Sequence, residues 1–213
     1  VGSPTPNMAG ALGDAAWMCS MERNADIVLM HCYAPLFVNV SDFGAGRSMQ
    51  WKSDLIGYDA LNSYGSPSYY AQQLFGTHQG DQILGTYAEN LPTYEWQPPA
   101  RKRNGVDQPT PKKQNVKSLF YSAMRDSQSG RIILKIVNRA DTAQAVQLTV
   151  SGVTSVTANG TATVLKADNR DATNSLEDPR HVVPTTEAVT GLGTNFTRTF
   201  PPCSITVLEL DAK

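Results

Sequence analysis

The chain has 213 residues, of which 40% are hydrophobic and 17% charged, a composition typical of a folded globular protein and too apolar for intrinsic disorder. This length suits one large or two small domains, and the formal net charge of −1 gives no support to a nucleic-acid partner. The longest apolar runs are far shorter than a membrane span, so the sequence predicts no membrane partner either.

The N-terminal part predicts a helix followed by a buried strand. Residues 7–22 show apolar side chains at helical spacing after Asn7, a plausible N-cap. Residues 27–31 contain a continuous apolar run, typical of a parallel strand that is covered on both faces. A single strand of this kind would leave its edges unpaired, so we expect it to pair with strands that this chain does not contain. The expected partner is a missing N-terminal barrel segment, supplied as a separate chain, or a self-associated copy.

A long loop and a second helix follow. Residues 40–64 are rich in Gly, Ser and Asp, and a loop of this length inside a compact domain is usually functional. The next helix is predicted to begin at Ser66-Pro67 and to end near Gly76. The lone His31, at the end of the predicted strand, is interpreted as a buried structural histidine.

The second half predicts an antiparallel sandwich. Strand-like segments recur between turn signals without a helical period, at 118–124, 131–138, 145–150, 155–165 and 204–210. In the second of these segments, even-numbered Ile132, Leu134 and Ile136 should share one face, with Ile133 and Val137 on the other. The Pro-rich and basic stretch at 97–115 is interpreted as a solvated loop, because no aromatic residues are interleaved with its charges.

The sequence predicts no metal site and no cofactor. Cys19, Cys32 and Cys203 lack metal-type spacing, and the first two are expected to be buried thiols. A GxSxG elbow, a P-loop and a Rossmann glycine pattern are all missing from the sequence. Three Asn-X-Ser/Thr sequons are compatible with an extracellular glycoprotein: Asn39, Asn159 and Asn195.

Several long blocks resemble the C-terminal part of α-L-arabinofuranosidases of glycoside hydrolase family fifty-one. They are GSPTPNMAGALGDAAWMCSMERNADIV (2–28), YAPLFVN (33–39), QWKSDLIGYDALNSYGSPSYYAQQLF (50–75), NSLEDP (174–179) and PCSITVLEL (202–210). The resemblance implies a (β/α)8 barrel followed by a jelly-roll sandwich, and an enzyme that acts on terminal arabinofuranosyl groups of arabinan and arabinoxylan. Residues 1–80 would then be the last helix–strand–helix units of an incomplete barrel, and 81–213 the sandwich.

No catalytic residue is predicted in this chain. A retaining glycosidase needs two carboxylates roughly 5 Å apart, and the resemblance places both glutamates on earlier barrel strands, outside this sequence. Glu22 should end a helix at the bottom of the barrel, and the other glutamates fall in the connection, in sandwich loops or in the last strand: Glu89, Glu95, Glu177, Glu187 and Glu209. Asp42, Asp54 and Asp59 are interpreted as turn formers. The isolated chain is therefore expected to be inactive.

Part of a sugar pocket is predicted after the apolar strand. Tyr33 and Asn39 follow that strand and Trp51 lies in the next loop, and such side chains stack on sugar rings or bind their hydroxyl groups. The alternative is that Tyr33 and Trp51 fill the core between barrel and sandwich. At the level of the whole chain, the alternatives to an enzyme part are a non-catalytic carbohydrate-binding module and a structural cap on the barrel.

Overall fold

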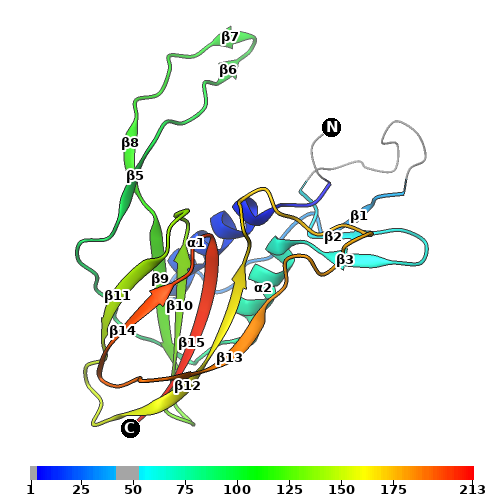
Figure 1. The fold of residues 1–213 in the computed structure, drawn as a ribbon. Helices are drawn as coiled ribbons and strands as arrows, with labels where there is room; N and C mark the ends of the chain where they lie inside the picture. Colours follow the sequence, from blue (N-terminus) through cyan, green and yellow to red (C-terminus); the bar gives the residue numbers. More distant parts are fainter. Residues whose placement is uncertain (1–3, 42–52) are drawn as a thin grey trace.

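The computed structural model describes residues 4–41 and 53–213 (Figure 1). Its centre is a six-stranded antiparallel sheet with the strand order β13-β12-β15-β10-β9-β4. The bounds of these strands are β4 Gln82–Ile83, β9 Leu119–Arg125, β10 Arg131–Asn138, β12 Val156–Lys166, β13 Thr185–Thr190 and β15 Ser204–Ala212. A second antiparallel pair is formed by β11 Gln144–Thr149 and β14 Asn195–Phe200. The predicted, mainly β, antiparallel sandwich is confirmed.

The central sheet is covered on both faces. Ile133 and Val137 of β10 lie in one core cluster with the two helices, α1 Met8–Arg23 and α2 Pro67–Thr77. Ile132 and Ile136 lie on the opposite face, in clusters that contain Phe196 and Phe200 of β14. The predicted alternation of faces along this strand is therefore confirmed, and the fold has three layers, with helices, the large sheet and the β11–β14 pair in that order.

Both helices begin where their caps predict. The side chain of Asn7 accepts a hydrogen bond from the Gly10 N–H at 3.2 Å, and the Ser66 hydroxyl accepts one from the Tyr69 N–H at 3.1 Å. The predicted end of α2 at Gly76 is one residue too early. The helix continues to Thr77, and the His78 N–H still donates a hydrogen bond to the Leu74 carbonyl.

The predicted strand at 27–31 is wrong. The structure assigns no strand there, and Ile27, Leu29 and Met30 are 75%, 88% and 89% exposed. A strand that is apolar on both faces needs neighbours on both edges, and the described part of the chain supplies none. His31 and Cys32 are exposed for the same reason, which contradicts both burial predictions.

The loop predicted at 40–64 contains two short strands in its described part. β2 Ile56–Tyr58 pairs in parallel with β1 Phe37–Asn39 and antiparallel with β3 Ser63–Gly65. These three strands form a small separate sheet beside α2 (Figure 1).

The stretch at 97–115 is an arm, not a loop. β5 Thr93–Trp96 pairs with β8 Gln114–Lys117, and farther out β6 Lys102–Arg103 pairs with β7 Val106–Asp107. Figure 1 shows this two-stranded ribbon projecting away from the sandwich. Its tip is a two-residue turn in which Asn104 and Gly105 have φ values of 52° and 78°, the conformation that favours an Asn-Gly hairpin.

Candidate functional site

Of the three predicted sugar-pocket residues, the structure describes two, Tyr33 and Asn39. Trp51 lies outside the described residues. Tyr33 is half-buried, and its hydroxyl donates a hydrogen bond to the Ser53 carbonyl at 2.9 Å. Asn39 is half-buried in β1, and its side-chain oxygen accepts from the Ser41 N–H at 2.9 Å. Both described side chains are thus held by local backbone contacts.

Tyr33 stands in a protected acidic environment. Burial, together with the smaller effect of the carboxylates of Asp14 and Asp54, raises the pKa of its phenol to about 12. The phenol therefore keeps its proton at neutral pH and acts as a hydrogen-bond donor. Burial also raises the pKa values of Asp14 and Asp54 above 3.8.

The aspartates of the long loop differ from one another. Asp59 is a turn former as predicted, because its side chain accepts from the N–H groups of Leu61 and Asn62 at 2.8 and 2.6 Å. Asp54 is not a turn former, because its side chain is buried (1% exposed) and its Oδ2 has no hydrogen-bond partner among the described residues. Asp42 lies outside the described residues.

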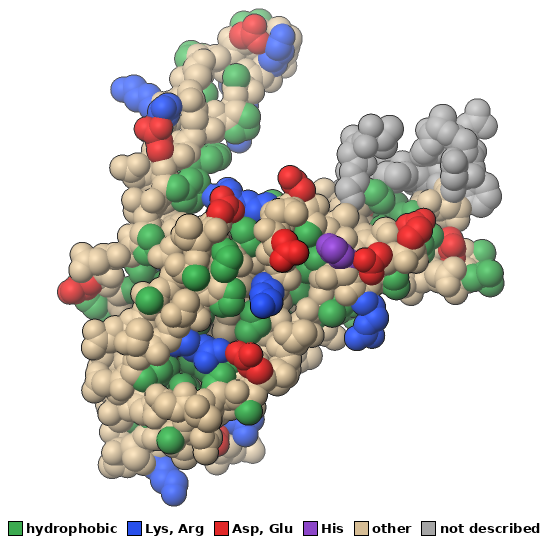
Figure 2. All heavy atoms as spheres, in the orientation of Figure 1, with side chains coloured by type: hydrophobic (Ala, Val, Ile, Leu, Met, Phe, Trp, Pro, Cys, Tyr) green, Lys and Arg blue, Asp and Glu red, His purple; other side chains and the backbone are tan. Residues whose placement is uncertain are grey.

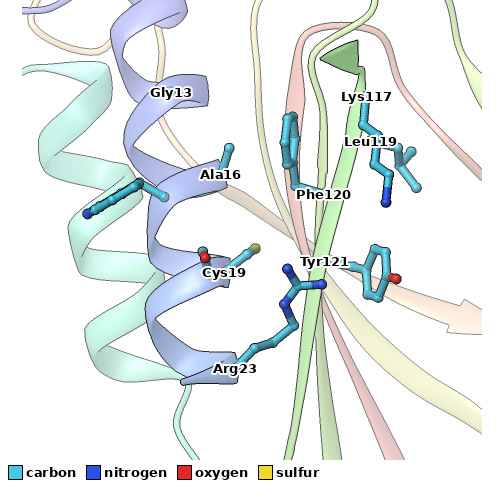
Figure 3. Close-up of a pocket in the computed structure, with 10 residues that line it drawn as sticks. Gly13, Ala16, Cys19, Arg23, Lys117, Leu119, Phe120 and Tyr121 are labelled. Atoms are coloured by element: carbon cyan, nitrogen blue, oxygen red, sulfur yellow. The ribbon is translucent and has the colours of Figure 1, made fainter. Parts of the chain in front are cut away.

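A groove lies between α1 and β9. Its volume is about 390 Å³, and Arg23 reaches across it from the end of α1 so that its guanidinium lies 5.4 Å from the centre of the Tyr121 ring (Figure 3). Lys117 lines the same groove, as does Trp17, whose side chain is 68% exposed. This surface combines the exposed Trp17 ring and two half-buried aromatic rings with two cations, and none of its lining residues is a carboxylate.

A buried ion pair fixes the end of α1 to the sheet. Lys135, in the middle of β10, is fully buried and pairs with Glu22. The second oxygen of Glu22 accepts from the Ser122 hydroxyl at 2.5 Å, and the Lys135 ammonium also donates to the Phe75 carbonyl at 3.3 Å. Burial lowers the pKa of Lys135 below 10.5, an effect that the Glu22 carboxylate partly offsets. Sequence reasoning missed this pair, although a lysine inside the apolar run of β10 was a signal for it.

The remaining glutamates are distributed over elements that carry no shared site. Glu95 lies in β5, Glu177 in a loop and Glu209 in β15, whereas Glu187 lies in β13 and not in a loop as predicted. Among the residues described, there is no group of three His, Cys, Asp or Glu side chains that could hold a metal ion. Over the same ranges, no helix has the length and hydrophobicity needed to cross a membrane.

The three sequons lie on strands. Asn159 is exposed on β12, and Asn195 is exposed on β14, where its side-chain oxygen accepts from the Thr149 hydroxyl at 2.8 Å. Asn39 is the half-buried residue of β1 described above. Glycosylation of these residues stays a prediction.

Known proteins with similar sequences are arabinofuranosidases. The chain is 28% identical over 211 residues to alpha-L-arabinofuranosidase 1 of Arabidopsis thaliana, and 29% identical over 205 residues to alpha-L-arabinofuranosidase A of Aspergillus kawachii. The alignments cover 97% and 95% of this chain but only 27% of each relative.

Solved structures agree with this comparison. An arabinose-bound GH51 α-L-arabinofuranosidase matches with a TM-score of 0.79 and 33% identity, over 99% of this chain and 28% of that one. The Thermotoga maritima α-L-arabinofuranosidase, at 22% identity and a TM-score of 0.75 over 97% of this chain and 39% of that one, shows the shared fold alone. The sequence model of the alpha-L-arabinofuranosidase C-terminal domain matches residues 3–204. The chain therefore belongs to the α-L-arabinofuranosidase C-terminal domain family.

Proposed function

We propose that this chain is the C-terminal part of a retaining glycoside hydrolase that releases terminal α-L-arabinofuranosyl groups from arabinan or arabinoxylan. The family match over residues 3–204 carries the proposal, and the names of the relatives support it. Because the chain spans 27% of the length of those relatives, the activity belongs to the longer protein.

The chain by itself should not hydrolyse arabinofuranosides. A retaining mechanism requires a nucleophile and an acid/base carboxylate at close range. The carboxylate of Glu22, the glutamate most deeply placed between helix and sheet, is already occupied by Lys135 and Ser122. Glu95 is likewise paired with Lys113 at 2.6 Å on the arm. These contacts support the expectation that both catalytic glutamates come from elsewhere in the longer protein.

An exposed apolar surface supports a barrel as the missing partner. Ile27, Leu29, Met30 and Phe37 follow α1 with side chains at least 59% exposed, and Trp17 is exposed on the helix itself. Several large, highly exposed apolar side chains in one short segment indicate an interaction surface. We assign residues 1–80 to the end of the barrel and 81–213 to the sandwich, with 27–31 becoming a strand once its neighbours are present.

The sugar-pocket prediction fits this arrangement. Tyr33 and Asn39 follow the segment that would form the last barrel strand, and residues just past the carboxyl end of a barrel strand face the ligand. The phenol oxygen of Tyr33, whose proton is donated to the Ser53 carbonyl, would accept a hydrogen bond from a sugar hydroxyl, and Trp51 would stack on the ring. The arabinofuranosyl polysaccharide is thus the proposed substrate partner of the longer protein.

The decisive experiment compares the 213-residue chain with the full-length protein on an aryl α-L-arabinofuranoside. We expect turnover by the full-length protein and none by the chain alone. Turnover by the purified chain that disappears when one of its own carboxylates is replaced would refute the claim that both catalytic glutamates lie outside this chain. An inactive full-length protein that is folded would refute the assigned activity.

A barrel-stabilising role for the sandwich is favoured by one further observation. The ion pair of Glu22 with Lys135 and the common core of α1, α2 and the sheet tie the proposed barrel helices to the sandwich. Deleting residues 81–213 from the full-length protein should therefore lower the midpoint of thermal unfolding of the barrel. An unchanged midpoint would argue against this structural role.

A further inference from the structure

The arm at residues 93–117 has no role in the proposed hydrolysis, yet it has regular secondary structure. Two antiparallel ladders and an Asn-Gly turn hold it extended, and every residue from 93 to 117 is exposed or only half-buried. A two-stranded ribbon without a core is marginally stable by itself. At about 3.3 Å per residue, each strand reaches on the order of 30 Å from the sandwich. Such an element presents a large surface to a partner.

The arm concentrates positive charge on a chain that is otherwise acidic. It holds six Lys or Arg residues against two Asp or Glu, a net charge of +4, whereas the chain as a whole has −1 and the remainder therefore −5. Two cations are neutralised locally, since Lys102 pairs with Asp107 at 3.3 Å and Lys113 with Glu95 at 2.6 Å. In the described part of the chain, the other four form no ion pair: Arg101, Arg103, Lys112 and Lys117. Figure 2 shows Lys and Arg side chains along the projecting arm.

The two faces of the arm differ in chemistry. The register pairs Tyr94 with Val116 and Trp96 with Gln114, so alternation along the strands places these four side chains on one face. Trp96 is 39% exposed, and the ring of Tyr94 lies 4.4 Å from the Arg139 guanidinium. The opposite face carries Lys117 and the Lys113–Glu95 pair. The arm thus joins an aromatic face to a cationic one, which the loop interpretation of this stretch had missed.

We propose that the arm binds an anionic polysaccharide, one that bears uronic-acid carboxylates, and so holds the enzyme on acidic substrate chains. The inference rests on the proposed function and names its substrate class. Charge complementarity selects the occupant, because four unpaired cations on an extended ribbon match carboxylates repeated along a polymer. The exposed indole of Trp96, on the other face of the same ribbon, suits the apolar face of a sugar ring.

The test uses the full-length protein and two polymers, polygalacturonate and a neutral arabinan, in a depletion binding assay. Wild-type protein should bind polygalacturonate at low ionic strength. Raising the salt from 0.1 to 1 M should release it, because the Debye length falls from about 10 to about 3 Å. Neutral arabinan binding should depend little on salt.

Matched triple variants isolate the arm. Neutralising three of its unpaired cations should weaken polygalacturonate binding roughly tenfold, because each exposed charge contact contributes only modestly and the three losses combine. The variant is Arg101→Gln with Arg103→Gln and Lys112→Gln. The control removes the same charge from exposed positions on the body, with Lys166→Gln, Arg180→Gln and Lys213→Gln, and should change binding less than twofold. Thermal unfolding checks that both variants are folded.

The outcomes separate this inference from the proposed function. Equal losses in the two triple variants would show a general charge effect and overturn the role of the arm, as would wild-type protein that ignores polygalacturonate. A change of oligomeric mass on neutralising the arm, or tighter binding to a nucleic acid than to polygalacturonate, would assign it a different occupant. Turnover of the aryl arabinofuranoside by the wild-type protein tests the proposed function separately, because that small neutral substrate has no carboxylate for the arm.

Discussion

The buried pair of Lys135 with Glu22 allows a quantitative test of how the helices are fixed to the sheet. Replacing Glu22 by Leu leaves the Lys135 ammonium without its carboxylate in a site that is 0% exposed. Among the described residues, the Phe75 carbonyl at 3.3 Å would remain as its hydrogen-bond acceptor, and the face of the Phe75 ring lies 4.6 Å away. Removing one member of a buried ion pair typically costs 3–5 kcal/mol, so we expect Glu22→Leu to lower the free energy of unfolding by about 4 kcal/mol.

The reverse substitution should be milder. Lys135→Met leaves a Glu22 carboxylate whose side chain is 14% exposed and still accepts from Ser122, so we expect a loss of about 1–2 kcal/mol. The double variant replaces the pair by two apolar side chains of similar volume and should be within about 1 kcal/mol of the wild type. The coupling energy between the two positions is the sum of the two single costs less the cost of the double variant, so it should be about 5–6 kcal/mol.

Equilibrium urea unfolding of the four proteins, followed by circular dichroism, measures these values. The arm supplies a control pair of the same two residue types: Lys113 and Glu95 lie 2.6 Å apart but are 59% and 58% exposed. The same cycle there should give a coupling energy below about 1 kcal/mol. Additive effects at Lys135 and Glu22, or a Glu22→Leu cost under about 1 kcal/mol, would refute the claim that the buried pair fixes the helix end.

Three further predictions concern single side chains. With an aromatic disulfide reagent, Cys32 of this chain should react rapidly because it is exposed, whereas buried Cys19 should react only on unfolding; equal rates would contradict the fold. Burial raises the pKa of Cys19 from 9.0 to about 12, so the folded state keeps a proton that the unfolded state loses. Wild-type stability should thus fall more steeply than that of Cys19→Ala as the pH rises from 9 towards 12, by up to about 1.4 kcal/mol per unit, and parallel curves would contradict this. Asn174→Ala should lower the free energy of unfolding in urea by roughly 2–4 kcal/mol, because the side chain of Asn174 bonds to both the N–H and the carbonyl of Val182. A loss below about 1 kcal/mol would refute that role.

Local signals predicted the elements whose causes are local. The caps at Asn7 and Ser66 placed the two helix starts, because each side chain satisfies an N–H group of the adjoining turn. One of the turn signals between the strand-like segments, Asp126-Ser-Gln-Ser-Gly130 before β10, forms a turn that closes with the Gly130 N–H bonded to the Asp126 carbonyl at 2.8 Å. The resemblance to family fifty-one enzymes was likewise carried by contiguous blocks and is confirmed by the family match.

Non-local causes account for what the sequence missed. The apolar run at 27–31 has the composition of a buried strand, but its burial depends on neighbours that the described chain does not provide. β13 and β14 carry polar Thr and Asn residues and depend on pairing with β12 and β11, which no local pattern reveals. The partner of Glu22 is 113 residues away along the chain, so only the fold could identify it.

The core shared by helices and sheet explains how the described chain keeps its shape. Met8, Leu12 and Phe75 of the helices pack in one cluster with Val137 and Ile205 of the sheet. Each fully buried apolar side chain of this kind contributes about 1.5–3 kcal/mol relative to its exposed state. That gain is made entirely within the described chain, and it holds α1 and α2 in place. Ile27, Leu29 and Met30, which follow α1, belong to none of the core clusters of the described chain, and their side chains stay exposed.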